Sequence, residues 1–353
     1  MRQPKLGVGF LGAGPVTQAI HLPALARLRQ DFEVTHVNDI NADVAASVAA
    51  RVGAEYSTSS EVLLEDRDVD VVAVCSPHEF HAVQVIAACR AGKKAVLCEK
   101  PFAMSREEAD EIAAVAAETG VPIIVGAMHA FDPGWRAVSS HWGSLPETSH
   151  TIRSSIVLPP NPRFEDFATE VITRPASVPS DLTDVEVRAA MVRNGVVTLA
   201  IHDLPLIRTL VPRFDDLVVH SAYALAPFGF QIVLTAGAKR IELHATMPAN
   251  PWRPEWVLEA YSDDQALRVE FSPSFVQAGS AVATLLTAES SQTWGPGPFN
   301  GYEGEWRALA AIARGRQAPP SIEDLIDDLR FALAIGDASA DVVRAHGRAG
   351  AMA

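Results

Sequence analysis

Short apolar runs and amphipathic segments alternate along the first 127 residues. The apolar runs cover residues 6–11, 32–37, 69–74, 94–98 and 121–126. Segments with helical spacing lie between them, among others at 42–52 and from Ser105 to Gly120. Because β-branched runs of this length suit strands that are buried on both faces, the alternation predicts a doubly wound parallel sheet.

Local signals predict where some of these helices begin and end. Pro15 suits a first helical turn, where its missing N–H costs nothing. Pro23 predicts a break near residues 21–22 and a new helix after it. Ser105 and Glu108 have the spacing of a capping box, so a helix is expected to begin there.

Beyond about Met128 the pattern changes to longer alternation of apolar and polar residues. Six segments alternate in this way, at residues 151–157, 217–224, 231–235, 240–246, 256–261 and 281–287. Their spacing predicts a mostly antiparallel open sheet with one solvated or partner-covered face. The pattern therefore divides the chain into an N-terminal α/β domain (1–127) and a C-terminal α+β domain (128–353).

The remaining segments of the second domain are less regular. Residues 158–183, rich in proline and polar side chains, are expected to form a long loop. Residues 195–210 have helical spacing, in which Pro205 predicts a kink or an early end. Two closing helices, near 303–314 and 322–334, are able to pack back on the N-terminal domain.

Composition narrows the class of protein. The chain carries a formal net charge of −14, so its surface repels phosphates and no nucleic-acid partner is expected. No apolar run approaches the roughly 18 residues of a membrane span, and the N-terminus lacks a secretory signal pattern. The three cysteines form no C-x-x-C pair and the histidines have no metal-ligand spacing. We therefore expect a cytoplasmic protein with no membrane partner and no metal site.

Two overlapping glycine patterns follow the first apolar run. Gly7-x-Gly9-x-x-Gly12 fits the expression for a dinucleotide-binding turn but lies mostly within the predicted strand. Gly12-x-Gly14-x-x-Thr17 lies where the strand becomes a helix, which is the context that phosphate binding requires. There Gly12 permits the tight turn and Gly14 lets backbone N–H groups approach a pyrophosphate. Thr17 replaces the usual third glycine or alanine.

The helix that begins at Pro15 and Val16 offers its positive N-terminus to that pyrophosphate. Asp39 ends the second predicted strand, at about the distance where a carboxylate binds the ribose hydroxyls and repels a 2′-phosphate. Residues 40–41 offer no basic side chain to hold such a phosphate. The pattern predicts NAD(H) rather than NADP(H), with a helix-capping or surface role for Asp39 as the alternative.

Five segments have a pattern beyond that of the glycine turn: VGFLGAGPVTQAIHLPAL (8–25), CSPHEFH (75–81), AGKKAVLCEKP (91–101), GVVTLAIH (195–202) and the closing region 305–334. The most specific piece is Glu99-Lys100-Pro101. Together they resemble the glucose-fructose oxidoreductase / inositol dehydrogenase / rhizopine catabolism (Gfo/Idh/MocA) family, whereas residues 151–194 match it poorly.

This resemblance implies a Rossmann domain followed by a mostly antiparallel α/β domain. The sheet of the second domain commonly serves as an oligomer interface, so a homodimer or homotetramer is expected. The resemblance also implies reversible hydride transfer between nicotinamide C4 and a carbinol or carbonyl carbon, often of a sugar or cyclitol. An NAD(H)-dependent oxidoreductase acting on a small polar substrate is the leading hypothesis.

Lys100 and His202 are the residues to which the resemblance assigns catalysis. Removing hydride from an alcohol requires that the hydroxyl proton leave too, and Lys100 can accept it if the adjacent NAD⁺ ring lowers its pKa. The negative charge of Glu99 would raise the pKa of Lys100 instead. His202 matches a family histidine that binds or helps deprotonate the hydroxyl, although purely structural roles stay open for both residues. Thr198, where the family usually has aspartate, would share a helical face with His202 but cannot act as a base.

Further contacts follow from the same resemblance. Cofactor contacts are expected at Ser76, Pro77, His78, His81, Glu99 and Lys100. For His81, packing beneath the loop is an equal alternative. Met128 and His129 could line the substrate pocket, although a core role is favoured for both. Asp203 follows His202 but points about a quarter-turn away on a helix, and is not assigned as a base.

Two functions of other classes also fit this sequence. Some relatives of the fold oxidise a sugar only transiently, so that a glycosidic bond can eliminate. The second alternative is a regulatory protein that binds the cofactor without catalysis. Thr198, in place of the usual aspartate, gives that alternative some weight. Residues 158–183 are expected to shape the pocket, but they carry no pattern that names the substrate.

Overall fold

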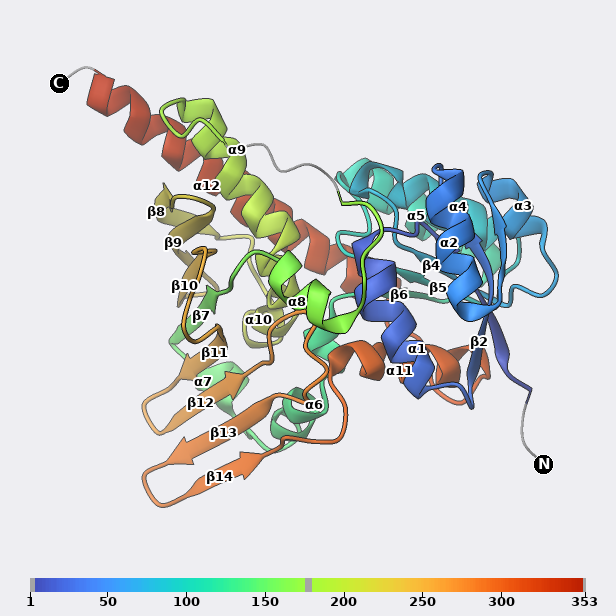
Figure 1. Cartoon of the computed structure of the whole chain (residues 1–353). Coiled ribbons are helices and arrows are strands. Elements are labelled where there is room, and N and C mark those ends of the chain that lie inside the picture. The colour runs from blue at the N-terminus through green and yellow to red at the C-terminus, as the bar shows by residue number, and fades with distance from the viewer. Residues whose placement is uncertain (1–3, 175–179, 352–353) are drawn as a thin grey trace. The chain divides into compact units, whose positions relative to one another are not determined.

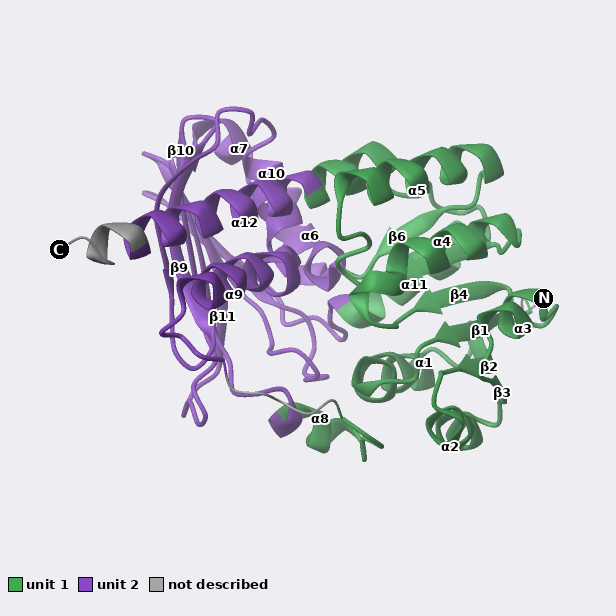
Figure 2. Ribbon diagram, turned by 90° about the horizontal axis from the view of Figure 1, so that it is seen from above, with its two compact units in different colours: residues 1–126, 164–176, 302–329 green, residues 127–163, 177–301, 330–353 purple. Residues whose placement is uncertain are grey.

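The computed structural model describes residues 4–174 and 180–351, which form two compact units (Figures 1 and 2). The first comprises residues 1–126, 164–176 and 302–329, and the second 127–163, 177–301 and 330–353.

The first unit contains a six-stranded parallel sheet with the order β3-β2-β1-β4-β5-β6. Its strands are β1 (Leu6–Leu11), β2 (Phe32–Asn38), β3 (Glu55–Ser57), β4 (Val71–Val74), β5 (Ala95–Cys98) and β6 (Ile123–Val125). Every residue of β1, β4 and β5 is buried. Since central strands of a parallel sheet are covered on both faces, this burial explains the continuous apolar runs. The predicted doubly wound parallel sheet is confirmed.

The helices of this unit lie in the connections between the strands and in the closing region. They are α1 (Leu22–Arg27), α2 (Ala42–Val52), α3 (Ser60–Glu65), a 3₁₀ turn (His78–Phe80), α4 (His81–Arg90), α5 (Arg106–Thr119) and most of α11 (Gly301–Ala313). The capping box before α5 forms in part: Ser105 Oγ accepts from the Glu108 N–H at 3.2 Å. The Glu108 carboxylate accepts from the Met104 N–H at 2.7 Å, one residue before the expected partner.

A new helix, α1, begins at Leu22 where the break before Pro23 was predicted, but the chain stays helical across this junction. A π-helix (Thr17–His21) continues directly into α1, and Pro23 lies in the first turn of α1. In the π-helix the backbone hydrogen bonds span five residues, as in the bond from the Leu22 N–H to the Thr17 carbonyl. The missing N–H of proline thus falls where two helical forms join, and the chain stays helical.

The second unit contains an eight-stranded sheet with the order β14-β13-β12-β11-β7-β10-β9-β8. The strands are β7 (Thr151–Val157), β8 (Val218–Ala224), β9 (Gly229–Ala236), β10 (Lys239–Thr246), β11 (Glu255–Tyr261), β12 (Gln265–Glu270), β13 (Val282–Thr287) and β14 (Ser291–Trp294). Only β7 and β10 pair in parallel among these neighbours, so the mostly antiparallel sheet is confirmed. The alternation did not reveal β12 or β14, and β14 is largely exposed.

Alternation of buried and accessible side chains gives this sheet two different faces. Along β10, Ile241, Leu243 and Ala245 are buried, whereas the residues between them are accessible. Figure 2 shows α9 (Val185–Thr198), α10 (Leu204–Leu210) and α12 (Ile322–Ala351) on one side of the sheet. On the other side, charged side chains form ion pairs, such as Arg153 with Glu242 at 2.9 Å.

The remaining helical segments are α6 (Pro133–Ser139), α7 (Leu145–Thr148), α8 (Pro162–Ala168) and two 3₁₀ turns (Met128–Phe131 and Ala200–His202). The expected long loop at 158–183 therefore contains α8, and residues 175–179 of it lie outside the described residues. The helix expected at 195–210 is divided, and its break precedes Pro205, which lies in the first turn of α10.

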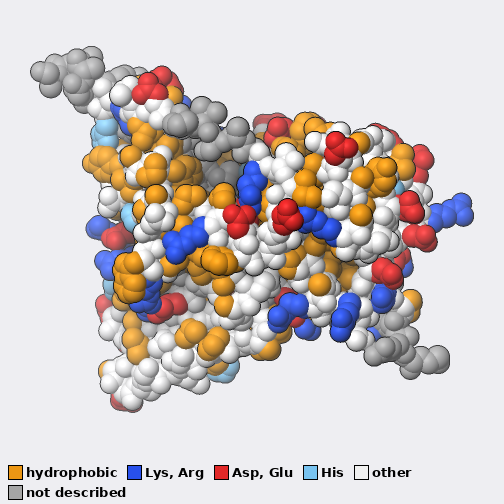
Figure 3. Space-filling view, in the orientation of Figure 1, with side chains coloured by type: hydrophobic (Ala, Val, Ile, Leu, Met, Phe, Trp, Pro, Cys, Tyr) orange, Lys and Arg blue, Asp and Glu red, His pale blue; other side chains and the backbone are white. Residues whose placement is uncertain are grey.

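Acidic, basic and hydrophobic side chains are interspersed on the face shown in Figure 3. No large field of basic side chains dominates that face, in keeping with the net charge of −14. Among the helices that the structure describes, none is long and apolar enough to cross a membrane.

Candidate functional site

The turn after β1 approaches the end of β4 very closely. Gly12 has a φ of +97°, and a Cβ there would lie 2.7 Å from the carbonyl carbon of Cys75 and the backbone N of Ser76. A side chain at Gly12 would therefore push the two segments apart. A Cβ at Gly14, in contrast, would meet no atom within 4 Å. The space beside Gly14 is thus open to a phosphate group.

Gly7 and Gly9 are required by strand packing instead. A Cβ at Gly7 would lie 1.7 Å from the backbone oxygen of Asp68, and one at Gly9 would lie 2.8 Å from the side chain of Leu63. Both glycines lie inside β1. Their resemblance to a phosphate-binding pattern therefore has a different physical cause.

Two buried polar side chains stabilise the Gly12–Gly14 turn. Thr17 Oγ1 donates to the Gly12 carbonyl at 2.7 Å, a bond that the glycine usual at this position could not make. Gln18 Nε2 donates to the Ala13 carbonyl at 2.8 Å, and its Oε1 accepts from the Ile172 N–H at 2.9 Å. Sequence reasoning missed Gln18, because its partner Ile172 is far away along the chain.

Asp39 joins the end of β2 to the same turn. Its Oδ2 accepts from the Ala13 N–H at 2.9 Å, and its Oδ1 accepts from the Asn41 N–H at 2.9 Å. Each carboxylate oxygen can accept a further hydrogen bond, so Asp39 still has capacity for ribose hydroxyls. The next residue, Ile40, is 94% exposed and offers an apolar surface beside it.

Glu99 and Lys100 follow β5. Glu99 Oε1 lies 3.0 Å from His21 Nε2, and Oε2 accepts from the Lys100 backbone N–H at 3.2 Å. Burial raises the pKa of Glu99, but the hydrogen bond from His21 opposes burial, and the pKa of Glu99 lies below its usual value. Burial lowers the pKa of Lys100, and the Glu99 charge opposes this only partly. Lys100 therefore releases a proton more readily than a surface lysine does.

A buried chain of polar groups continues from Glu99 to α11. Trp306 Nε1 donates to His21 Nδ1 at 3.1 Å, so in the neutral ring Nε2 carries the proton and donates to Glu99. Donor atoms of His21, Glu99 and Glu305 lie within 4.8 Å of one another, which is close enough for a metal ion. Both nitrogens of His21 are already engaged, however, so the geometry is that of a hydrogen-bonded chain.

Glu305 is the unusual member of this chain. It is 0% exposed, and neither carboxyl oxygen has a hydrogen-bond partner among the described residues. Burial raises the pKa of Glu305 well above its usual value. Sequence analysis treated this segment only as a closing helix, because nothing local indicates that the glutamate meets Glu99.

The loop after β4 carries two histidines with different environments. His81 is fully buried, with Nδ1 2.7 Å from the Pro101 carbonyl and Nε2 2.8 Å from the Ser76 carbonyl. It therefore joins the loop after β4 to the bend after β5. His78 is half-buried, and burial together with the Lys100 charge lowers its pKa to about 4, so its ring is neutral at physiological pH.

Within the first unit, the predicted cofactor residues lie at one edge of the sheet. They follow the carboxyl ends of the parallel strands β1, β2, β4 and β5, which are neighbours in the sheet. In chain order they are Gly12, Gly14, Pro15, Val16, Asp39, Ser76, Pro77, His78, His81, Glu99 and Lys100. This edge is where open α/β sheets bind ligands.

The predicted substrate residues all belong to the second unit. His202 ends a 3₁₀ turn and is 5% exposed. Thr198 is the last residue of α9, and its Oγ1 donates to the Asn194 carbonyl at 2.7 Å. Because the α-helix ends between Thr198 and His202, the shared-face argument for these two residues fails.

A fully buried carboxylate, Asp203, connects three elements of this unit. Its Oδ1 lies 2.7 Å from His129 Nδ1, and its Oδ2 accepts from Ser154 Oγ at 2.6 Å. Trp256 Nε1 lies 3.0 and 2.9 Å from the two oxygens. Sequence reasoning missed this network, because a regular helix would have pointed Asp203 elsewhere. The inward register of Ser154 on β7 was the available signal.

His129 and Met128 differ in what surrounds them. The His129 ring stacks on Phe271 with centroids 3.7 Å apart, and its centroid lies 6.0 Å from that of His202. Met128 is 2% exposed. Its backbone oxygen would lie 2.0 Å from a Cβ at Gly301, so Met128 packs tightly against the start of α11.

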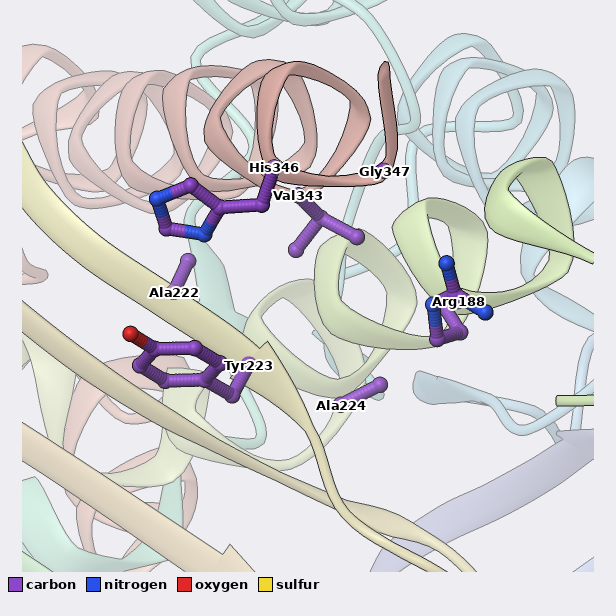
Figure 4. Close-up of a pocket in the computed structure, with 7 residues that line it drawn as sticks. All are labelled: Arg188, Ala222, Tyr223, Ala224, Val343, His346 and Gly347. Carbon is purple, nitrogen blue, oxygen red and sulfur yellow. The ribbon is translucent and has the colours of Figure 1, made fainter. Parts of the chain in front are cut away.

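A cavity of about 510 Å³ lies in the second unit between β8, α9 and α12. Figure 4 shows Tyr223 and His346 beside each other in it, with Arg188 farther along. The rings of Tyr223 and His346 stack at 5.6 Å. None of the predicted cofactor, catalytic or substrate residues lines this cavity.

Comparison with known proteins identifies the first part of the chain. The profile of an oxidoreductase family with an NAD-binding Rossmann fold, Gfo/Idh/MocA, matches residues 6–127. Residues 6–127 therefore match the NAD-binding domain of this family. The resemblance drawn from the Glu99-Lys100-Pro101 signature and the glycine turn is confirmed.

Curated relatives match over a similar length of chain. An inositol 2-dehydrogenase of Saccharopolyspora erythraea is 41% identical over 130 residues, which are 36% of this chain and 38% of the relative. A 1,5-anhydro-D-fructose reductase of Ensifer adhaerens is 44% identical over 122 residues, 34% of this chain and 35% of the relative. The matches thus span well under half the length of these relatives.

Solved structures of this fold extend the likeness to nearly the whole chain. A UDP-N-acetylglucosamine 3-dehydrogenase from Acidithiobacillus ferrooxidans superposes with a TM-score of 0.73 at 18% identity, covering 97% of this chain and 100% of that one. A 3-ketoreductase from Actinomadura kijaniata, in complex with NADP and TDP-benzene, gives 0.64 at 23% identity, covering 97% and 98%. At such identities the likeness shows the fold of both units.

Proposed function

We propose that this chain is an NAD(H)-dependent oxidoreductase that transfers hydride to or from a carbinol or carbonyl carbon of a small polar substrate such as a sugar or cyclitol. The observation that carries the proposal is the position of Lys100. It follows β5 at the sheet edge that holds the Gly12–Gly14 turn, and its pKa is lowered by burial. A readily titrated amine next to a dinucleotide turn suits alcohol–carbonyl interconversion.

The residues present fit a bound NAD(H). The open space at Gly14 accommodates phosphate, Asp39 can accept from the ribose hydroxyls, and Ile40 offers an apolar surface. Asp39 also favours NAD(H) over NADP(H), because its charge opposes a 2′-phosphate. The bound nicotinamide supplies the acceptor or donor of hydride.

The chain's own residues would handle the proton and the substrate. Lys100 gives or takes the hydroxyl proton, and its cationic form stabilises the developing alkoxide. Glu99 sets the charge beside Lys100 and so sets the pH at which Lys100 is neutral. His202 anchors the reacting hydroxyl, while Thr198 can contribute only a hydrogen bond, and Met128 and His129 lie near the substrate.

The decisive experiment follows NADH absorbance in both directions with sugars, cyclitols, hydroxy acids and carbonyl compounds. NADPH is tested in parallel. We expect wild-type turnover with NAD(H), and a fall of at least about 100-fold in kcat for Lys100→Ala, since positioned acid–base groups contribute 10²–10⁴-fold. Lys94→Ala, at an exposed lysine of the preceding strand connection, is the matched control.

The other outcomes separate the alternatives. Equal turnover in wild type and Lys100→Ala would exclude Lys100 as the proton donor or acceptor. Product release from a glycoside without net NADH would indicate elimination. NADH binding without any turnover, together with capture of a protein partner, would indicate the regulator.

We also propose a cytoplasmic homodimer or homotetramer that associates through the helix-free face of the second sheet. The ion pairs across that face, such as Arg153–Glu242 and Arg268–Glu259, support an ordered polar surface of the kind that a second copy can match. The described cysteines Cys75, Cys89 and Cys98 are free thiols, which suits a reducing compartment.

A further inference from the structure

The Asp203 network presents a histidine in the state that proton transfer requires. Asp203 can only accept hydrogen bonds, so the short contact of 2.7 Å places the proton of a neutral His129 ring on Nδ1. The lone pair then lies on Nε2, which makes no hydrogen bond to any described residue. A carboxylate that fixes the tautomer of an imidazole in this way prepares it to accept a proton.

The ring is held rigidly in this orientation. It stacks on Phe271 at an interplanar angle of 13° and packs edge-on against Trp256, with centroids 4.6 Å apart. Ser154 and Trp256 bond the same carboxylate, so Asp203 cannot turn away from His129 without losing those bonds. Such fixed geometry keeps the reorganisation on protonation small.

The network also lies beside the predicted substrate anchor. Asp203 follows His202 directly, and the centroids of the His129 and His202 rings are 6.0 Å apart, so the two imidazole rings are neighbours. Thr198, at the position where a carboxylate was expected, donates its hydroxyl to a backbone carbonyl. The acidic group that Thr198 lacks is thus provided by Asp203, acting through a histidine.

We propose that His129, oriented by Asp203, is the proton relay of this oxidoreductase and exchanges protons with the substrate hydroxyl through His202. The proposal rests on the proposed function. In the oxidation, a bound oxidised nicotinamide cofactor would supply the acceptor for the hydride that leaves the substrate C–H bond with its electron pair. The O–H bond breaks as C=O forms and Lys100 takes its proton, as proposed above; the relay then carries that proton by way of His202 to Nε2 of His129. The imidazolium, stabilised by Asp203, then releases the proton to water, and reduction reverses each step.

The test compares His129→Gln, Asp203→Asn and Ser154→Ala. Glutamine can still donate to Asp203 but cannot take up a proton, and Ser154→Ala removes a different hydrogen bond from the same carboxylate. We expect His129→Gln to lower kcat by at least about 100-fold, to lose the limb of the kcat–pH profile that His129 produces, and to recover in part with added imidazole. Asp203→Asn should show a smaller loss, and Ser154→Ala should keep the wild-type limb.

Other titrating groups could contribute to that limb. His202 and Asp203 lie beside the ring, and Asp132 interacts with it electrostatically. Imidazole NMR of the cofactor-free protein therefore gives a readout independent of activity. We expect His129 to carry its proton on Nδ1 near neutral pH, and to lose that preference in Asp203→Asn.

The outcomes separate this proposal from the function on which it rests. Turnover by the wild type that His129→Gln retains within about threefold, or a His129 proton found on Nε2, would overturn the relay alone. The relay would also be overturned if His129→Gln lost all turnover without rescue by imidazole and Ser154→Ala lost the same limb of the kcat–pH profile. The network would then have only a structural role. Absence of turnover in every form of the protein would overturn both.

Discussion

At the scale of single residues, two buried carboxyl groups differ in their hydrogen-bond partners. Asp203 is 0% exposed, and donors from three other residues satisfy its oxygens. Glu305 is equally buried, but its oxygens have no partner among the described residues. Because an unpaired buried charge is very costly, Glu305 is expected to stay protonated at neutral pH.

This difference predicts how stability depends on pH in Glu305→Gln. The folded-state pKa of Glu305 is raised by burial, whereas the unfolded chain ionises near its usual value. The stability that the protonated form gives is therefore complete below the unfolded pKa and is lost as pH rises toward the folded one. Glutamine does not titrate, so the variant should gain up to about 1.4 kcal/mol of unfolding free energy per pH unit over wild type in that window.

Urea unfolding of both proteins at pH 5, 6, 7 and 8 measures this difference. Glu303→Gln is the matched control on α11, because the Glu303 carboxylate is also buried but is paired with Arg27 and Arg307. That variant should lose ion pairs without showing the rising trend. A Glu305→Gln difference that does not change with pH would contradict the interpretation.

At the scale of elements, hydrogen bonds at helix ends connect the sheet edge to the helices behind it. Asn41 caps α2 by accepting from the Asp43 and Val44 N–H groups at 3.0 and 3.3 Å. It also donates its backbone N–H to Asp39. One residue thus begins the helix and holds the carboxylate proposed to bind ribose.

We expect Asn41→Ala to lower the free energy of unfolding of the first unit by about 1 kcal/mol, because the cap bonds are lost. Ser59→Ala is the control: Ser59 precedes α3, but its side chain makes no cap bond there, so its loss should be within about 0.5 kcal/mol. Thermal unfolding monitored by circular dichroism gives both values. Equal effects of the two substitutions would show that the Asn41 cap contributes little.

Elements were predicted well where local chemistry determines them. The bounds of β1 and α2 match the pattern, because a buried strand and a capped helix are specified by their own residues. The segment from α9 to α10 was not predicted well, because its 3₁₀ turn brings His202 and Asp203 to their partners on other elements. Here packing against the sheet overrides the helical spacing.

At the scale of the whole molecule, the helix-free face of the second sheet is the surface on which assembly can be tested. Val233 lies in the outward register of β9, opposite Glu242. If the face is an interface, Val233→Asp should place an unpaired charge inside it and split the oligomer. We expect light scattering to give a multiple of 37.8 kDa for wild type and 37.8 kDa for the variant.

Val83→Asp is the control for this measurement, because Val83 is 60% exposed on α4 of the first unit. It should leave the mass unchanged. A wild-type mass of one chain, or an equal effect of both substitutions, would contradict assembly through the sheet.

The sequence by itself determined the parallel and antiparallel sheets, and it placed the glycine turn, Asp39 and Lys100 after the ends of strands. Each depends on hydrophobic periodicity or on a short motif at the end of a strand, where a few neighbouring residues carry the whole signal. Only the tertiary structure joined Glu305 to the Glu99 network and His129 to Asp203. These groups are far apart in the chain, and what makes them special is burial together with a specific partner. Burial and long-range partners arise from packing, which no local pattern records.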